Sequence, residues 1–188
     1  MRDKVKDLLL ESIAVKEDIL RSKIGDILDI ANLMIEALKK NGKVILFGNG
    51  GSASDSQHIA AELVGRFKKD RKALAAVSLT VNTSVLTSLA NDYGYDIVFA
   101  KQIEALGQKN DVAVGISTSG KAKNVINGIK QAKKMDIKTV VLTGTNGLEL
   151  AKCADVFLVV DSSVTARIQE AHITIGHILC ELIEDALC

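Results

Sequence analysis

The sequence predicts an α/β fold, a three-layer sandwich in which a mainly parallel sheet is flanked by helices. Short continuous apolar runs, such as the one at 44–47, are typical of buried parallel strands. From Lys43 onwards such runs alternate with segments whose apolar residues recur at helical spacing. The 188 residues are a length that one domain usually occupies, so we expect a single domain over 1–188.

The expected elements follow from these patterns. Strands are expected at 44–47, 74–79, 112–116, 139–142 and 156–160. Helices between them are expected at 53–67, 83–90, 96–106, 122–135 and 148–152. A last helix at about 164–187 is apolar on nearly all sides from Ala171 to Ile183, which predicts that it is buried. Residues 1–40 read as two helices that either pack on the 43–188 core or form an oligomerisation arm.

Charge and composition argue against several classes of partner. Lys and Arg number 24 against 23 Asp and Glu, a net charge of +1, and this near-balance removes the simplest electrostatic argument for a protein that binds nucleic acid or a membrane surface. Aromatic residues make up only 3%, so base-stacking platforms are not expected. The three cysteines form no C-x-x-C pair, and no apolar run approaches the roughly 20 residues that a membrane span needs. We therefore expect a cytoplasmic protein with no nucleic-acid and no membrane partner.

One candidate phosphate site follows the third expected strand. Ser117, Thr118, Ser119 and Gly120 precede a helix, and free backbone N–H groups, hydroxyls and the helix dipole favour an anion there. Lys121 and its neighbours add positive charge. The alternative is that these hydroxyls only cap the helix, although capping needs one hydroxyl and not three.

A glycine-rich loop follows the first expected strand. The stretch from Gly48 to Ala53 fits G-x-G-x-x-A, a loose dinucleotide-binding pattern. The acidic residue that such a site needs about 20 positions later is missing, because the second strand ends in Val-Ser-Leu-Thr. We therefore interpret Asn49, Gly50, Gly51 and Ser52 as a loop that approaches a sugar closely.

Two of the three histidines have suggestive neighbours. His58 and Glu62 are four residues apart on one helix face, which suits two ligands of one metal, a carboxylate base oriented by an imidazole, or a surface pair. His177 and Gln169 lie on the last helix, roughly 80° apart around the axis and about 12 Å apart along it. We expect His172 to be structural.

These motifs together resemble the phosphoheptose isomerases (sedoheptulose-7-phosphate isomerases) of the sugar isomerase (SIS) domain superfamily, almost from end to end. The matching stretches are F-G-N-G-G-S-A at 47–53, Q-H-I-A-A-E-L at 57–63, A-N-D-Y-G at 90–94, G-I-S-T-S-G at 115–120 and T-A-R-I-Q-E-A-H at 165–172, with His177. The resemblance implies reversible conversion of sedoheptulose 7-phosphate into D-glycero-D-manno-heptose 7-phosphate, an early step towards activated heptose for surface polysaccharide. It also implies a homotetramer with one zinc ion in each site.

The resemblance assigns roles residue by residue. Glu62 and His177 match the catalytic acid–base pair, and a carboxylate and an imidazole suit proton transfer through an enediol near neutral pH. The expected metal ligands are His58, Glu62, Gln169 and His177. The expected substrate-binding residues are Asn49, Gly50, Gly51, Ser52, Glu62, Asn91, Asp92, Ser117, Thr118, Ser119 and Gln169. Because Gln169 and His177 are so far apart on one helix, we expect two copies to share each active site, one giving Gln169 and the other His177.

One position departs from the family pattern. The family commonly has a serine two residues after the glycine of the Ser-Thr-Ser-Gly loop, and here that residue is Ala122. The rival functions are a non-catalytic SIS module that senses sugar phosphates and a replication-initiation adaptor. A sensor normally carries a DNA-binding segment, which is not evident here. The adaptor relatives lack the equivalents of Glu62 and His177, so the sequence favours the enzyme.

Overall fold

The computed structural model describes residues 1–188 and contains one five-stranded sheet. The strands are β1 (Val44–Gly48), β2 (Ala76–Ser78), β3 (Val112–Ser117), β4 (Lys138–Gly144) and β5 (Val156–Val160). The helices are α1 (Arg2–Ser22), α2 (Ile24–Lys39), α3 (Gly51–Val64), α4 (Thr83–Tyr93), α5 (Val98–Leu106), α6 (Lys123–Lys134), α7 (Leu148–Ala151) and α8 (Thr165–Leu187), with short 3-10 turns η1 (Tyr95–Ile97) and η2 (Thr145–Gly147). The strand order is β2-β1-β3-β4-β5, and all neighbours are parallel.

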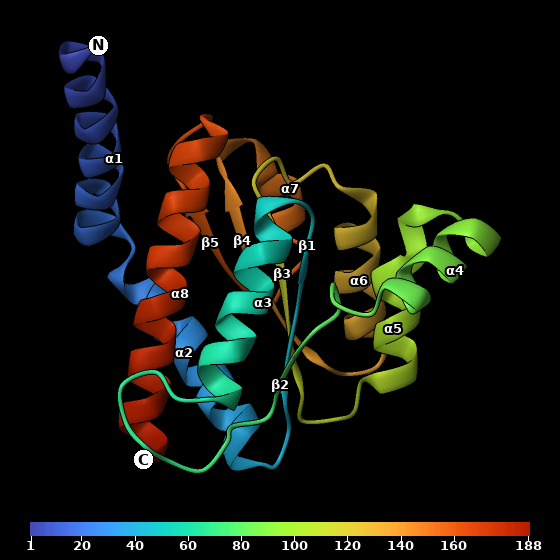
Figure 1. The fold of residues 1–188 in the computed structure, drawn as a ribbon. Coiled ribbons are helices and arrows are strands. Elements are labelled where there is room, and N and C mark those ends of the chain that lie inside the picture. The colour runs from blue at the N-terminus through green and yellow to red at the C-terminus, as the bar shows by residue number, and fades with distance from the viewer.

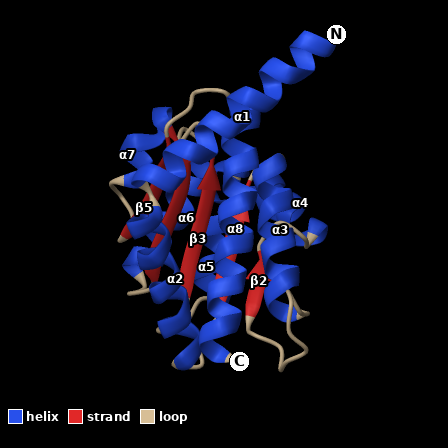
Figure 2. Ribbon diagram, turned by 90° about the vertical axis from the view of Figure 1, so that its left-hand side faces the viewer, coloured by secondary structure: helices blue, strands red, loops and turns tan.

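Helices cover both faces of the sheet, which confirms the predicted three-layer α/β fold (Figures 1 and 2). Alternate strand residues face opposite layers, as strand geometry requires. Leu46 and Val114 belong to the larger apolar cluster, which α2, α3 and α8 close. Ile45 and Phe47 belong to the smaller one, which α5, α6 and α7 close. None of the helices is both long enough and apolar enough to cross a membrane.

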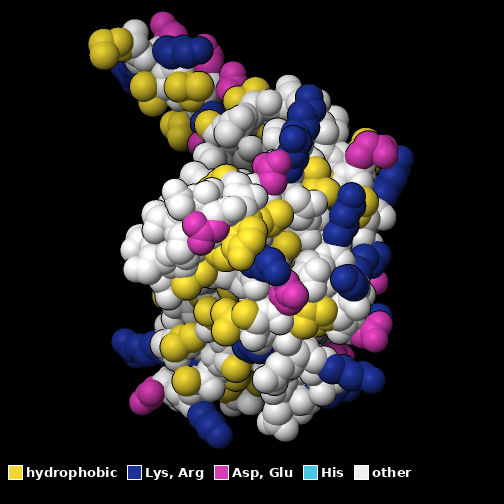
Figure 3. Space-filling view, turned by 90° about the vertical axis from the view of Figure 1, so that its right-hand side faces the viewer, with side chains coloured by type: hydrophobic (Ala, Val, Ile, Leu, Met, Phe, Trp, Pro, Cys, Tyr) yellow, Lys and Arg dark blue, Asp and Glu magenta, His cyan; other side chains and the backbone are white.

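Helix α1 is the element least covered by the rest of the chain. It projects from the body beyond the carboxyl edge of the sheet (Figure 1), and Ile19 is its only buried residue. Its exposed large apolar residues are Val5, Leu8, Leu9, Leu10, Ile13 and Leu20. Figure 3 shows hydrophobic side chains along this arm. Arg167 of α8 holds the arm in its N-terminal third by donating to the Leu8 carbonyl at 2.6 Å.

Helix α8 lies beside α3 and runs in the same direction (Figure 1). The two helices approach closely at Gly176, because a Cβ at that position would overlap the Ile59 side chain. The expectation that α8 is buried on nearly all sides is only partly met. Ile175 and Leu179 are buried, but Ile178 is 38% exposed, because the layer that α8 joins covers only the sides facing the sheet, α2 and α3.

A buried carboxylate fixes the far ends of α3 and α8. Glu184 of α8 is 1% exposed and accepts hydrogen bonds from the backbone N–H groups of Phe67, Lys68 and Lys69 at 2.8–3.2 Å. It also pairs with the Arg71 guanidinium at 2.9 Å. Burial by itself would raise the pKa of Glu184, but these donors outweigh it and lower the pKa to about 2. The carboxylate therefore anchors the segment that follows α3.

Glu184→Gln should lower the melting temperature at neutral pH, because the amide cannot accept from Arg71 and three N–H groups at once. The folded-state pKa is depressed from 4.5 to about 2, so the stabilisation by the carboxylate is complete above about pH 4.5 and is lost as the pH falls towards 2. The difference in unfolding free energy between the wild type and the variant, measured by urea titration, should shrink across this window.

Glu181→Gln is the matched control, because Glu181 lies on the same helix but forms an exposed pair with Lys68. It should leave stability nearly unchanged. A Glu184→Gln protein with a wild-type urea midpoint at pH 7 would contradict the anchoring role.

Candidate active site

The loops that carry most of the predicted site lie side by side at the carboxyl edge of the sheet. Strands β1 and β3 are neighbours, with Gly48 opposite Ile116, so the loop at Asn49–Gly50 and the loop at Ser117–Gly120 emerge next to each other. Ligands of open parallel sheets bind beyond this edge. The topology therefore joins two loops that are about 70 residues apart in sequence.

The Ser-Thr-Ser-Gly loop is shaped by its glycine and by hydrogen bonds to its own hydroxyls. Gly120 has a φ of +64°, and a Cβ there would overlap the backbone of Gly147, so only glycine suits the position. The hydroxyls of Ser117 and Ser119 accept from N–H groups inside the loop, at 3.2 and 3.3 Å. Neither caps α6, and the N-cap residue, Ala122, has no side-chain cap bond. The capping interpretation is therefore wrong.

The glycine-rich loop is tied to α6 by a pair of amides. The Asn49 Nδ2 group donates to Asn124 Oδ1 at 2.8 Å, and Asn124 Nδ2 donates back to Asn49 Oδ1 at 2.9 Å. The Tyr95 hydroxyl donates to the same Asn49 oxygen at 3.4 Å. Ser52 is buried at the start of α3. Gln169 of α8 lies over Gly51, where a Cβ would overlap its amide.

His58, Glu62 and His177 come together on the adjoining faces of α3 and α8. His58 Nε2 lies 3.0 Å from His177 Nε2 and 3.2 Å from Glu62 Oε1. The Phe67 ring lies beside the His177 ring, with centroids 5.6 Å apart. The His58 side chain is 48% exposed and that of Glu62 26%, so a ligand can reach them. His58, Glu62 and His177, here called the histidine group, offer a carboxylate and two imidazoles at one place. These are the groups that proton transfer needs.

Asp55 lies one helical turn before His58 on α3. Burial raises the pKa of its carboxyl to about 6, and the opposing charge of His58 limits the rise. Its Oδ2 atom is buried without a hydrogen-bond partner. A carboxyl group that changes charge near neutral pH thus adjoins the histidine group.

Other predicted site residues lie away from this group within one chain. Gln169 lies against Gly51, about 10 Å before His58 along α3. Asn91 and Asp92 lie on α4, where both are exposed and bonded to each other at 2.9 Å. Helix α4 has no buried residue. One chain therefore assembles the loops and the histidine group but not the whole predicted set.

The expected zinc ligands do not form a complete set within one chain. Histidine nitrogens and a carboxylate are donors that zinc uses, and His58 contacts both Glu62 and His177. No group of three or more His, Cys, Asp or Glu side chains is arranged to hold a metal ion, however. The fourth expected ligand, Gln169, lies too far from the other three along α8 to reach the same ion. The residues of a single chain therefore do not fit the ion.

His172 is structural in its placement. It is fully buried in α8, and its ring nitrogens make no hydrogen bond of ordinary geometry. Burial lowers the pKa of His172 to about 4, and the backbone of Thr143 partly opposes this. The ring is therefore neutral near pH 7.

Sequence reasoning missed four residues around the site. Asn124 and Tyr95 hold Asn49, Phe67 lies against His177, and Asp55 precedes His58. Asp55 could have been found from the sequence, because it lies one helical turn before His58, a candidate metal ligand. Asn124, Tyr95 and Phe67 make their contacts with residues at least 46 positions away in the sequence. Local residue spacing does not predict such contacts.

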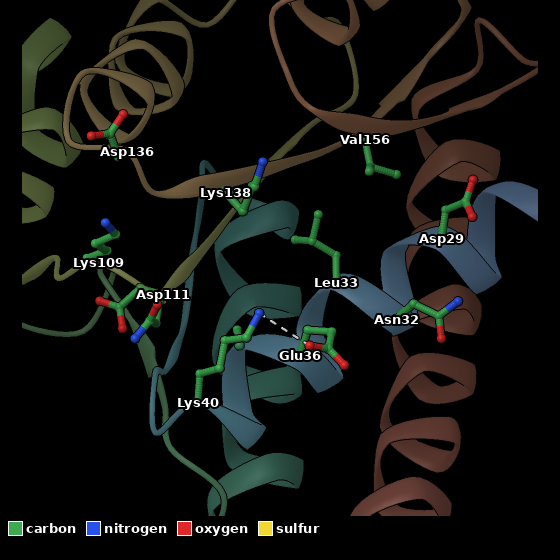
Figure 4. Close-up of a pocket in the computed structure, with 12 residues that line it drawn as sticks. Asp29, Asn32, Leu33, Glu36, Lys40, Lys109, Asp111, Asp136, Lys138 and Val156 are labelled. Atoms are coloured by element: carbon green, nitrogen blue, oxygen red, sulfur yellow. Dashed lines mark ion pairs between the residues drawn. The ribbon is translucent and has the colours of Figure 1, made fainter.

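A cavity of about 540 Å³ lies at the opposite, amino edge of the sheet, where α2 meets the residues that precede β3, β4 and β5 (Figure 4). Lys40, Lys109 and Lys138 line it together with four acidic residues, Asp29, Glu36, Asp111 and Asp136. Lys40 pairs with Glu36 at 3.3 Å. The balanced charge gives no preference for an anion, so this cavity does not compete with the Ser117–Gly120 loop as the phosphate site.

Comparison with known proteins agrees with this geometry. Residues 9–144 match the SIS domain. A phosphoheptose isomerase of Aquifex aeolicus is 51% identical over 188 residues, covering 100% of this chain and 98% of the relative. The structure of a phosphoheptose isomerase from Neisseria gonorrhoeae superposes with a TM-score of 0.92 at 43% identity over 98% of both chains. One from Francisella tularensis gives a TM-score of 0.94 at 34% identity over 97% of both chains. By sequence and by fold, the chain belongs to the phosphoheptose isomerase family of SIS-domain proteins.

Proposed function

We propose that this protein interconverts sedoheptulose 7-phosphate and D-glycero-D-manno-heptose 7-phosphate, an early step towards activated heptose for surface polysaccharide. The observation that carries the proposal is the meeting of Glu62, His58 and His177 across α3 and α8. Relatives that carry the phosphoheptose isomerase name cover the chain from end to end, which supports the same activity.

The reaction moves a carbonyl from C2 to C1 through an enediol. Glu62 takes a proton from C1 of the ketose while His177 supplies a proton to the C2 oxygen. Return of a proton to C2 and loss of the proton on the C1 oxygen then give the aldehyde. The Ser117, Thr118 and Ser119 segment holds the remote phosphate, and Asn49 and Gly51 approach the sugar. The phosphate thereby orients the reacting carbons without taking part in the chemistry.

Incubation of the purified protein with sedoheptulose 7-phosphate, followed by NMR with and without added zinc, tests the proposal. New aldose signals that build up to an equilibrium ratio are expected. No turnover under either condition would instead favour the adaptor-type function or another sugar phosphate.

Glu62→Gln should abolish isomerisation without unfolding the protein, because the amide keeps the shape but cannot accept a carbon-bound proton. His177→Ala should lower kcat at least about 100-fold, the lower end of what general acid–base groups contribute. Steady-state kinetics with the melting temperature measured in parallel separates catalysis from folding. Glu181→Gln, one turn beyond His177 on α8, is the control and should keep wild-type kcat. A variant of either catalytic residue with near wild-type kcat would remove that residue from the mechanism.

Ser119→Ala should raise KM about 10-fold and change kcat less, because a hydroxyl bonded to a charged phosphate is lost far from the reacting carbons. Ala122→Ser should lower KM or leave it unchanged and should stabilise the protein by about 1 kcal/mol, because it supplies the missing N-cap of α6. Kinetics and urea unfolding measure the two effects. Ser22→Ala, at the end of α1, is the control. Tighter binding of unphosphorylated sedoheptulose than of its phosphate would refute the phosphate role.

We also infer a homo-oligomer, a tetramer in the proposal, in which copies share active sites. Four observations support this. Gln169 is separated from the histidine group along α8, and the α4 residues Asn91 and Asp92 are exposed. Apolar side chains line the uncovered arm α1, and hydrophobic side chains also gather on the face of the body formed by α4 and α5 (Figure 3). Zinc belongs to this proposal, with His58, Glu62, Gln169 and His177 as ligands that come together only in the oligomer.

Hybrid oligomers test the sharing. Glu62→Gln and Gln169→Ala proteins should be nearly inactive alone, and equal mixing with subunit exchange should restore about one site in four. A mixture of Glu62→Gln with His177→Ala should stay inactive, because both residues contact His58 within one chain. Exchange is followed by mass spectrometry. A first mixture that stays inactive after confirmed exchange would mean that each chain builds its own site.

A further inference from the structure

The amide pair between Asn49 and Asn124 has a defined polarity. An asparagine side chain offers two N–H donors and one oxygen that can accept twice. The backbone N–H of Val125 donates to Asn124 Oδ1 at 2.9 Å, and a backbone N–H can only donate. The oxygen of Asn124 must therefore point at the start of α6, and its Nδ2 group must point at the Asn49 oxygen.

The orientation of the Asn124 amide fixes the orientation of the Asn49 amide. Its oxygen accepts from Asn124 Nδ2 at 2.9 Å and from the Tyr95 hydroxyl at 3.4 Å, which uses both acceptor positions. One of its two N–H groups goes to Asn124 Oδ1 at 2.8 Å. The second N–H has no partner in the chain. Turning the Asn49 amide over would place two donors and two acceptors face to face.

Asn124 can hold this arrangement because it is itself fixed. It is 3% exposed and lies in the first turn of α6, the helix that packs on β3 and β4 and closes the smaller apolar cluster. Asn49, by contrast, lies in the loop after β1 and is only partly buried. Of the two amides, the one on α6 is the rigid member, so it orients the other.

We propose that Asn124 is a positioning residue that holds Asn49 as a hydrogen-bond donor towards an oxygen of the sugar phosphate. The inference rests on the proposed function, in which the loop at Asn49 binds the sugar. It connects the sugar-binding loop to the helix that follows the phosphate loop, so both ends of the substrate are oriented by one rigid element. The group that Asn49 recognises is an acceptor, a hydroxyl or carbonyl oxygen.

Asn124→Asp tests the polarity with almost no change in shape. The carboxylate still accepts from Val125 and from Asn49, but its second oxygen faces the Asn49 oxygen and repels it. Asn49 then turns away, and KM should rise about 3- to 10-fold, the value of one hydrogen bond, with a smaller change in kcat. Asn124→Ser is the second variant, in case the aspartate variant folds poorly. Its hydroxyl can still accept from the N–H groups at the start of α6 but is too short to reach Asn49. It should raise KM by the same factor.

Asn127→Asp is the matched control. Asn127 lies one turn later on α6 and donates to the Asp96 carbonyl at 2.9 Å, so this variant also loses an amide bond but does not contact the loop. It should leave KM within twofold of the wild type. In an Asn49→Ala background, Asn124→Ser should cause no further rise in KM, because Asn124 acts only through Asn49. A wild-type KM for Asn124→Ser, an equal rise for Asn127→Asp, or additive effects in the double variant would each overturn the proposal.

An NMR readout separates this inference from the proposed function. The side-chain amide signals of Asn49 in the free protein should shift in Asn124→Ser and stay in place in Asn127→Asp. If the wild type does not isomerise sedoheptulose 7-phosphate, the proposed function fails, while the amide signals still decide whether Asn124 orients Asn49. Unshifted Asn49 signals in Asn124→Ser would refute the positioning role whatever the enzyme assay shows.

Discussion

The parallel alignment of α3 and α8 is the constraint on which the rest of the site depends. Both helices follow strands of the same parallel sheet and return over the same face, so they run in one direction. Gly176 lets them approach closely at Ile59. Their register then sets the pairs that face each other, Gln169 with Gly51 near the carboxyl edge and His177 with His58 two turns further. A shift of one turn would separate the imidazoles.

The far end of this helix pair is held by a buried ion pair in addition to the apolar packing of Leu63 and Ile183. Glu184 is buried among backbone donors and the Arg71 guanidinium, and Arg71 also donates to the carbonyls of Glu62 and Leu63 in the last turn of α3. The same arginine thus completes the end of the helix that carries Glu62. Because a buried carboxylate is tolerated only with its donors in place, the segment after α3 and the end of α8 are held in one arrangement.

At the other end, the carboxyl edge is organised by polar side chains. The loops after β1 and β3 emerge together because their strands are neighbours, and the Asn49–Asn124 pair joins the first loop to α6. The site thus combines a rigid edge that suits binding with a more exposed histidine group that suits proton transfer. The uncovered α1 and α4 lie outside both.

The sequence by itself determined the elements and the loops that carry chemistry. Apolar periodicity located the five strands and the helices within a few residues, because it reports local burial. The hydroxyls at Ser117–Ser119 and the pair of His58 and Glu62 were visible because their partners are adjacent or one turn away. Only the tertiary structure decided that His177 meets His58 while Gln169 does not, that Asn124 orients Asn49, and that Glu184 anchors α8. These contacts join residues 75 to 119 positions apart, and they depend on strand order and helix register, which no local spacing encodes.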